Sequence, residues 1–243
     1  MRICVAQTRP VIGDVQSNIE KHKALIDLAA SSGADMVIFP ELSITGYEPG
    51  LAEELATNQH DSRFDDFQKI SDARQVTIGV GVPTKNGAGV SISMVLFQPH
   101  KERQTHSKKY LHSDEEPFFT SGQSTVDLTC GGVKIALAIC YELSVPEHAE
   151  KAFKRGAKIY IASAAKSAVG VEGAIERLSE IAAKYSMTVL MSKCVGRCDN
   201  FESAGRSSVW NDGGLLLGQL NDTDEGIIVI DTDTQELTEK TVE

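Results

Sequence analysis

The sequence predicts an α/β fold in which two β-sheets pack against each other and helices cover their outer faces. Short apolar runs recur along the chain, and most are nearly continuous, as is typical of strands covered on both faces. Helical patterns separate several of these runs, but they are too few to cover both faces of one large sheet. The expected strands are ICVAQ, MVIFP (36–40), VTIGVGVP (76–83), VKIALAIC (133–140), KIYIASAA (158–165), TVLMS (188–192) and GIIVI (226–230).

Two segments have the spacing of amphipathic helices. Residues 17–32 place their apolar side chains along one stripe, and Gly33 is the expected stop. Residues 172–186 form a second stripe of the same kind. Each lies between two expected strands, which is typical of a strand–helix–strand unit.

Two other stretches have the pattern of hairpins or meanders. They cover residues 76–98 and 205–230, and their turn signals are Asn86-Gly87 and Asp212-Gly213-Gly214. The chain contains no repeat and no linker, so residues 1–243 are expected to form one domain. The acidic tail after Asp231 is expected to fray.

Composition argues against several classes of function. The chain has 24 basic and 34 acidic residues and a net charge of −10, without a Lys/Arg cluster, so neither nucleic acid nor a membrane surface is an expected partner. No apolar run approaches the ~20 residues of a membrane span. The N-terminus lacks the pattern of a secretory signal, and five cysteines favour reduced thiols. We therefore expect a cytoplasmic protein.

Cys140 lies where an apolar strand gives way to a helix. That helix is expected to begin with Ser144 as N-cap, Pro146 in the first turn and Glu147 completing a capping box. Amides at such a strand–turn–helix junction favour a thiolate and can receive an oxyanion. A free cysteine is equally well explained as a small buried apolar side chain, so the local pattern leaves both interpretations open.

Two further positions carry groups that suit a hydrolase. Glu41 follows a buried strand and Pro40, where burial raises a carboxyl pKa toward that of a general base. Lys108 and Lys109 precede several acids, and a lysine can hold its ammonium against an oxyanion. Taken singly, Glu41 is also explained as a loop carboxylate and the lysines as a solvated charge cluster.

The order and spacing of these groups resemble the nitrilase superfamily of carbon–nitrogen hydrolases. The matching stretches are PELSITGY, SKKYLHSDEEPFFTSG and KIALAICYELSVPEHA, with fainter similarity in GAKIYIASAA, KCVGRCDNFESAGRSSVWNDGG and EGIIVIDTD. The resemblance implies a four-layer α-β-β-α sandwich and a cysteine-dependent hydrolase of a small amide. It also implies no metal or organic cofactor, and a homodimer or higher homo-oligomer.

The resemblance assigns roles to individual residues. Glu41 would be the general base and Cys140 the nucleophile of a thioester mechanism. The family lysine generally precedes a leucine by three positions, which selects Lys108 as the oxyanion stabiliser and leaves its neighbour as the alternative. The supporting glutamate usually stands seven residues before a glycine, which selects Glu115, seven residues before Gly122.

Substrate contacts follow from the same resemblance. Tyr47, Tyr141 and Ala164 are expected to bind the substrate, with the Tyr141 amide as a second oxyanion donor. If SKKYL is a strand, its two lysines point to opposite faces, so only one can reach Cys140.

Departures from the family pattern bear on the substrate. Members that act on carboxylate-bearing amides often have arginine four residues after the cysteine, but this chain has Ser144 there. Neutral amides are therefore expected to be the better substrates, unless another cation such as Lys166 or Lys193 has taken over. Tyr141 stands where many true nitrilases have tryptophan, which favours an amidase over a nitrilase; an N-carbamoyl hydrolase is a further alternative.

Other interpretations involve other residues. His112 or His148 could act as the base for Cys140, as in papain-like enzymes, but neither lies in a recognisable motif. Cys194 and Cys198 lack two further ligands, so loop or core thiols are expected rather than zinc. A relative that only binds or scaffolds is a different class of function, and the presence of all the candidate catalytic residues argues against it.

Overall fold

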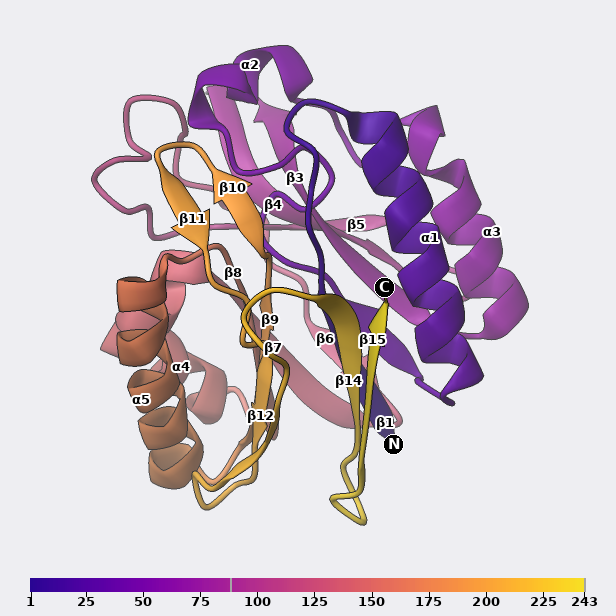
Figure 1. Ribbon diagram of the computed structural model, residues 1–243, viewed down its shortest axis with the longest axis vertical. Helices are drawn as coiled ribbons and strands as arrows, with labels where there is room; N and C mark the ends of the chain where they lie inside the picture. The colour runs from indigo at the N-terminus through magenta and orange to yellow at the C-terminus, as the bar shows by residue number, and fades with distance from the viewer. Residues whose placement is uncertain (88, 243) are drawn as a thin grey trace.

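Two sheets pack face to face in the computed structural model, which describes residues 1–87 and 89–242. Helices α1 (Val15–Ser31) and α3 (Asp65–Arg74) cover one sheet, and α4 (Pro146–Lys154) and α5 (Ala168–Tyr185) cover the other (Figure 1). The predicted α-β-β-α sandwich is therefore confirmed.

The first sheet combines strands from both ends of the chain. Its strands are β1 (Arg2–Gln7), β2 (Met36–Ile38), β3 (Thr77–Asn86), β4 (Gly89–Phe97), β5 (Gln104–Ser107), β14 (Glu225–Asp231) and β15 (Leu237–Val242). They run in the order β15-β14-β1-β2-β3-β4-β5. The predicted hairpin at 76–98 is the antiparallel pair β3–β4, while β1, β2 and β3 are mutually parallel.

The second sheet has three parallel strands at its centre. Its strands are β6 (Leu128–Cys130), β7 (Val133–Ile139), β8 (Ile159–Ala164), β9 (Thr188–Lys193), β12 (Ser208–Trp210) and β13 (Leu216–Gln219), in the order β13-β12-β9-β8-β7-β6. The parallel strands β7, β8 and β9 all end at the same edge. A small hairpin of β10 (Gly196–Cys198) and β11 (Phe201–Ser203) follows β9 near that edge.

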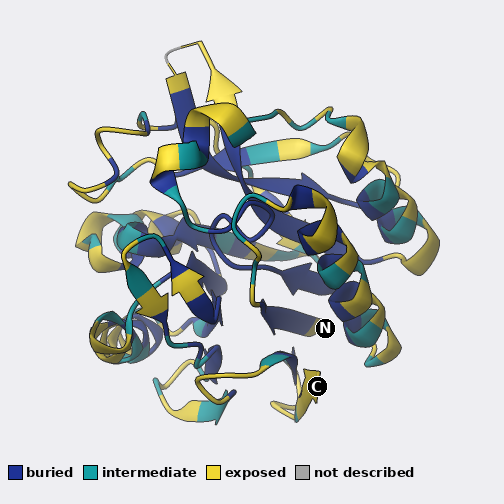
Figure 2. Ribbon diagram, turned by 45° about the horizontal axis from the view of Figure 1, so that its top comes forward, coloured by how far each residue is buried: buried dark blue, intermediate teal, exposed yellow. Residues whose placement is uncertain are grey.

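Apolar side chains fill three layers of core. One layer lies between the sheets and includes Ile38, Ile92 and Ile161, all nearly inaccessible. The other two lie between each sheet and its helices. Figure 2 shows that the central strands are buried, whereas the helices and the strands at the margins carry exposed residues. The strands are apolar on both sides because both faces are covered, which explains their nearly continuous apolar runs.

Side-chain caps and glycine set the ends of the longer helices. Asp14 accepts a hydrogen bond from the Ser17 amide at 3.0 Å at the start of α1, and Gly33, with φ +77°, follows its end. Ser167 caps α5 through the Gly170 amide at 3.2 Å. The shorter helical elements are η1 (Pro49–Leu51), α2 (Ala52–Leu55), η2 (Ser62–Phe64) and η3 (Cys140–Ser144).

The start of α4 differs from the prediction. Val145 is its N-cap residue and makes no side-chain cap hydrogen bond, while Pro146 is in the first turn as predicted. Ser144 instead ends the 3₁₀ turn η3, and the predicted capping box to Glu147 is wrong. The reason is that the chain first makes a separate tight turn after β7, which occupies the residues expected to cap the helix.

The C-terminal region also differs from the prediction. The stretch 205–230 is not one meander, because β12 and β13 pair in the second sheet while β14 pairs with β1 in the first. The tail after Asp231 was expected to fray, yet residues Leu237–Val242 form β15 against β14. Backbone pairing along a sheet edge orders this segment even though most of its side chains are exposed.

Candidate active site

Three candidate residues meet because each directly follows a strand. Cys140 comes immediately after β7, Lys108 immediately after β5, and Glu41 three residues after β2. Their hydrogen bonds and charges connect them across the two sheets. The sequence separates these residues widely, and the packing of the sheets brings them together.

Lys108 is completely buried and bridges two carboxylates. Its ammonium Nζ donates to Glu41 Oε1 at 2.8 Å and to Glu115 Oε1 at 2.6 Å. Burial disfavours the charged lysine, but the negative charges of Glu41, Cys140 and Glu115 outweigh this effect and raise the Lys108 pKa. Lys108 is therefore a fixed cation at this site.

Glu41 has one engaged oxygen and one free oxygen. Oε1 accepts from Lys108, whereas the buried Oε2 has no hydrogen-bond partner in the part of the chain that the structure describes. Burial raises the Glu41 pKa, Lys108 opposes that shift, and Glu115 adds to it. The predicted desolvated carboxylate with a raised pKa is confirmed in direction.

Cys140 occupies a strained position. Its φ of +45° lies in the left-handed region that a non-glycine residue rarely adopts, and its thiol donates to the Ala165 carbonyl at 3.4 Å. Burial and the Glu41 charge raise its thiol pKa to about 11, and the charges of Lys166 and Lys108 oppose this. The resting group is thus a thiol beside a carboxylate, and the helix start, which favours a thiolate, does not outweigh burial.

The two adjacent lysines have opposite environments. Lys108 is buried, while Lys109 is exposed. The strand β5 ends at Ser107, so SKKYL is not a strand as assumed, although the two lysines separate as predicted. The same contrast holds for the acids, because Glu115 is buried and Glu116 is exposed.

The predicted substrate-binding residues surround this group. The Tyr47 hydroxyl donates to Glu115 Oε1 at 3.1 Å. Tyr141 is half-buried and stacks edge-on with His112, at 5.2 Å between ring centroids. Ala164 is fully buried at the end of β8 and belongs to the same apolar cluster as Cys140.

Sequence reasoning missed Glu142. This buried carboxylate accepts hydrogen bonds from the amides of Ile139 at 2.8 Å and Lys109 at 2.7 Å. It therefore ties the turn that carries Cys140 to the segment that carries Lys108. An acid two residues after the candidate nucleophile was the available signal.

The other candidate residues lie in different environments. His148 bonds to the Tyr160 hydroxyl at 2.9 Å, and within the described residues no hydrogen bond joins His112 or His148 to Cys140. Cys194 and Cys198 are buried thiols whose sulfurs are 3.5 Å apart. Across residues 1–87 and 89–242, no group of three or more His, Cys, Asp or Glu side chains could hold a metal ion.

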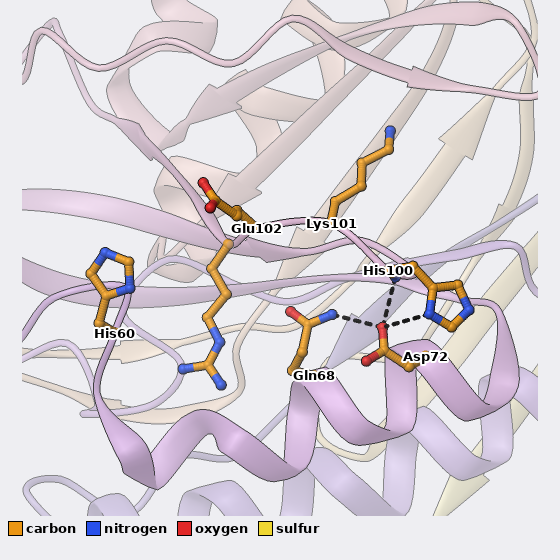
Figure 3. A pocket seen from close by; sticks show the side chains of 7 residues that line it. His60, Gln68, Asp72, His100, Lys101 and Glu102 are labelled. Carbon is orange, nitrogen blue, oxygen red and sulfur yellow. Dashed lines mark hydrogen bonds and ion pairs between the residues drawn. The ribbon is translucent and has the colours of Figure 1, made fainter.

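A surface hollow lies elsewhere, over α3 and the β4–β5 connection (Figure 3). Its Asp72 already accepts from the His100 amide at 2.8 Å and from Gln68 Nε2 at 2.9 Å. Asp72 is thus already engaged, and none of the residues that line this hollow is a nucleophile. The buried group around Cys140 is therefore the stronger candidate for chemistry.

The site combines the thiol of Cys140, on a strained backbone, with a lysine and two glutamates on an α-β-β-α sandwich. This combination is the one expected of a C–N hydrolase. The profile of the carbon-nitrogen hydrolase family matches residues 2–240, so the chain belongs to that family, within the nitrilase superfamily. It is an amidase-like hydrolase of this superfamily.

The relatives of this chain are similar along most of its length. It is 28% identical over 233 residues to a 2-oxoglutaramate amidase from Bacillus subtilis, covering 93% of this chain and 88% of that protein. It is 25% identical to a glutamine-dependent NAD(+) synthetase from Thermotoga maritima, of which it spans only 42%. Among solved structures, the NitN amidase from Nesterenkonia sp. AN1 is 25% identical with a TM-score of 0.85, covering 95% of this chain and 92% of that one.

Proposed function

We propose that this protein hydrolyses the C–N bond of a small amide through a thioester on Cys140. The observation that carries the proposal is the buried ammonium of Lys108, which Glu41 and Glu115 hold. Glu41 interacts with the nearby Cys140 thiol, and its Oε2 accepts no hydrogen bond at normal distance from the part of the chain that the structure describes. That arrangement supplies a base, a nucleophile and a fixed positive charge in one water-poor site. The relatives described as amidases support the same reaction class.

The mechanism begins with proton transfer from the thiol. Glu41 Oε2 takes the Cys140 proton as Sγ attacks the carbonyl carbon, and the carbonyl oxygen becomes an oxyanion. The Lys108 ammonium and the Tyr141 amide stabilise that oxyanion by donating hydrogen bonds to it. Glu41 then gives its proton to the leaving nitrogen, and ammonia or an amine departs.

The second half of the reaction frees the enzyme. A water gives a proton to Glu41 and attacks the thioester carbon, and the same two donors stabilise the second oxyanion. The C–S bond breaks, the acid product leaves, and the proton returns to Sγ. Glu115 keeps Lys108 charged and in place throughout, because it accepts a hydrogen bond from Nζ. Tyr47 and Ala164 are proposed to shape the substrate site.

A substrate panel combined with thiol labelling tests this function. Small amides, ω-amides, carbamoyl compounds and nitriles are incubated with the protein, and ammonia release is measured. We expect amides to react, and Cys140→Ala to be inactive. Nitrile hydrolysis without amide hydrolysis would instead support a nitrilase.

Labelling identifies the nucleophile independently of the substrate. Iodoacetamide at neutral pH should modify Cys140, which is 8% exposed, ahead of Cys194 and Cys198, which are each 1% exposed. A nearby base compensates for the raised thiol pKa of Cys140. Equal labelling of the other two thiols, with activity intact in Cys140→Ala, would contradict the assignment.

Three broader expectations accompany this proposal. We propose that residues 1–243 form one domain, because β1 pairs with β14 from the other end of the chain; limited proteolysis tests this. We propose a homodimer or higher homo-oligomer, which light scattering tests. The helices in residues 1–87 and 89–242 are too short or too polar to span a membrane. We propose a cytoplasmic location separately, which cell fractionation tests.

A further inference from the structure

Three neighbouring parallel strands deliver charged groups to one edge of the second sheet. Cys140 follows β7, Lys166 lies two residues after the end of β8, and Lys193 ends β9. The strand register pairs Ile139 with Ser163 and Ala164 with Lys193, so these strand ends lie side by side. Two lysines therefore flank the candidate nucleophile in addition to Lys108.

The backbone of Lys166 is held firmly at this edge. Its carbonyl accepts hydrogen bonds from Lys193 Nζ at 2.8 Å, Ser203 Oγ at 3.1 Å and the Ala204 amide at 3.2 Å. The preceding carbonyl, of Ala165, accepts from the Cys140 thiol. Because this backbone is well anchored, the Lys166 side chain begins at a defined position near Cys140.

The Lys166 side chain differs from the other two lysines in its partners. Lys108 is neutralised by two glutamates, and Lys193 is buried with its ammonium on backbone carbonyls. Lys166 is half-buried, and its ammonium has no hydrogen bond or ion pair to any residue that the structure describes. A cation without an acidic partner is available to an anion from outside.

The charge of Lys166 reaches the reacting sulfur. Burial and the Glu41 charge raise the Cys140 pKa, and the Lys166 charge lowers it. This lowering is larger than the one that Lys108 causes. Lys193, whose pKa burial lowers to about 8, lies close enough to interact with the same thiol. Three lysines thus face two glutamates around Cys140, although the chain as a whole carries −10.

We propose that Lys166 binds the anionic end of the substrate, so that the natural substrate is a small amide whose other end carries a carboxylate. Lys193 acts as a positioning residue, since its ammonium holds the carbonyl of Lys166. The amide half of this inference rests on the proposed function. Lys166 supplies the cation that Ser144 cannot, because Ser144 is exposed at the end of η3, whereas Lys166 directly follows Ala165, whose carbonyl accepts from the thiol.

A matched pair of substrates tests this assignment. Succinamate and butyramide differ by a carboxylate in place of a methyl group, so the ratio of their kcat/KM values isolates the contribution of the charge. In Lys166→Met we expect this ratio to fall by about 10- to 100-fold, the range of a charge-assisted hydrogen bond. Lys69→Met, an exposed lysine on α3, is the control and should leave the ratio unchanged.

Charge reversal makes the same test sharper. Lys166→Glu should lower the rate with succinamate further and raise the rate with 4-aminobutanamide relative to butyramide. If instead all substrates lose rate by the same factor in both variants, Lys166 acts on the chemistry and not on the substrate's charge. That result, or an unchanged ratio, overturns the proposal.

Binding separates this proposal from the proposed function. Calorimetric titration of succinamate into Cys140→Ala should show binding that weakens by about 10- to 100-fold when Lys166→Met is added. Lys166-dependent binding by a protein that hydrolyses neither amide would refute the hydrolase and keep the anion site. The opposite result is that the enzyme hydrolyses butyramide, while succinamate does not bind or binds equally well without Lys166. That result would keep the hydrolase and refute the anion site.

Discussion

The turn that carries Glu41 and the segment that carries Lys108 reach the same site by different physical means. The Glu41 turn is held by backbone packing: a Cβ at Gly81 would lie 2.3 Å from the Pro40 carbonyl oxygen and 2.5 Å from the Leu42 amide. Leu42 also has a φ of +50°. No residue with a Cβ fits at Gly81 without moving this turn.

Buried carboxylates hold the Lys108 ammonium and the residues that follow Lys108. Glu142 accepts from the Lys109 amide, and Glu115 accepts from the His112 amide at 2.8 Å as well as from Lys108 itself. Activity should therefore be sensitive to added side-chain volume at the Glu41 turn and to changes of charge at the Lys108 segment. Lys108 itself still makes backbone hydrogen bonds, because its amide donates to the Ile92 carbonyl at 2.8 Å and its carbonyl accepts from the Gly122 amide at 2.7 Å. After Lys108, carboxylates that bind backbone amides replace the pairing of β5.

The largest expected effect comes from breaking the charged region at its centre. Lys108→Ala removes the proposed oxyanion donor, so kcat should fall by about 10²- to 10³-fold. It also leaves two buried carboxylates without their cation, which should cost about 3–5 kcal/mol in the free energy of unfolding. Steady-state kinetics, circular dichroism and thermal melting measure both.

Lys109→Ala is the matched control for that substitution. Its side chain is exposed, and its backbone amide still donates to Glu142, so activity and melting should hardly change. Loss of activity in Lys109→Ala alone would move the catalytic role by one residue. Full activity in both variants would remove lysine from the mechanism.

Breaking the packed region should have the next largest effect. Gly81→Ala must displace the Pro40–Leu42 turn, and a shift of about 1 Å in a catalytic group can cost about 10²-fold in rate. Gly173→Ala, where a Cβ meets nothing within 4 Å in α5, should be neutral or slightly stabilising. A fully active Gly81→Ala enzyme would show that the turn adapts and that packing does not position Glu41.

A milder change to the charged region should have a smaller effect. Glu142→Gln keeps the volume but turns one acceptor oxygen into a donor that faces a backbone amide, so the Lys108 segment should loosen. We expect a loss of about 10-fold in kcat with KM little changed, and about 1–3 kcal/mol in stability. Glu116→Gln, on an exposed neighbour of Glu115, should show neither change.

The pH dependence gives the smallest and most specific signal. Burial raises the Glu41 pKa, and the proposed base must be ionised, so kcat/KM should fall as pH drops through a value above the ordinary 4.5. Gly81→Ala should move this limb to lower pH, because a displaced Glu41 meets water. Glu142→Gln should leave the limb in place. A wild-type acid limb at or below 4.5 would contradict a buried base.

Much of the site could be predicted because it depends on local spacing and strand ends. Lys108 lies three positions before a leucine, and this spacing selected it over the exposed Lys109. Glu115 lies seven positions before Gly122, and this spacing selected it over the exposed Glu116. The structure explains one of these spacings: a Cβ at Gly122 would lie 2.2 Å from Ser107 Cβ, next to Lys108. A close backbone approach therefore links the glycine to the lysine it accompanies.

The sequence by itself determined the class of fold, since continuous apolar strands with few helices allow little else than two covered sheets. Only the tertiary structure decided which sheet β14 joins, that β15 is ordered, and that Glu142 binds the Lys108 segment. It also decided that Lys166 lies near Cys140 without a side-chain partner among the described residues, while the Lys193 ammonium donates to backbone carbonyls. These outcomes depend on hydrogen bonds and charges between segments far apart in the chain, and local pattern carries no information about such partners.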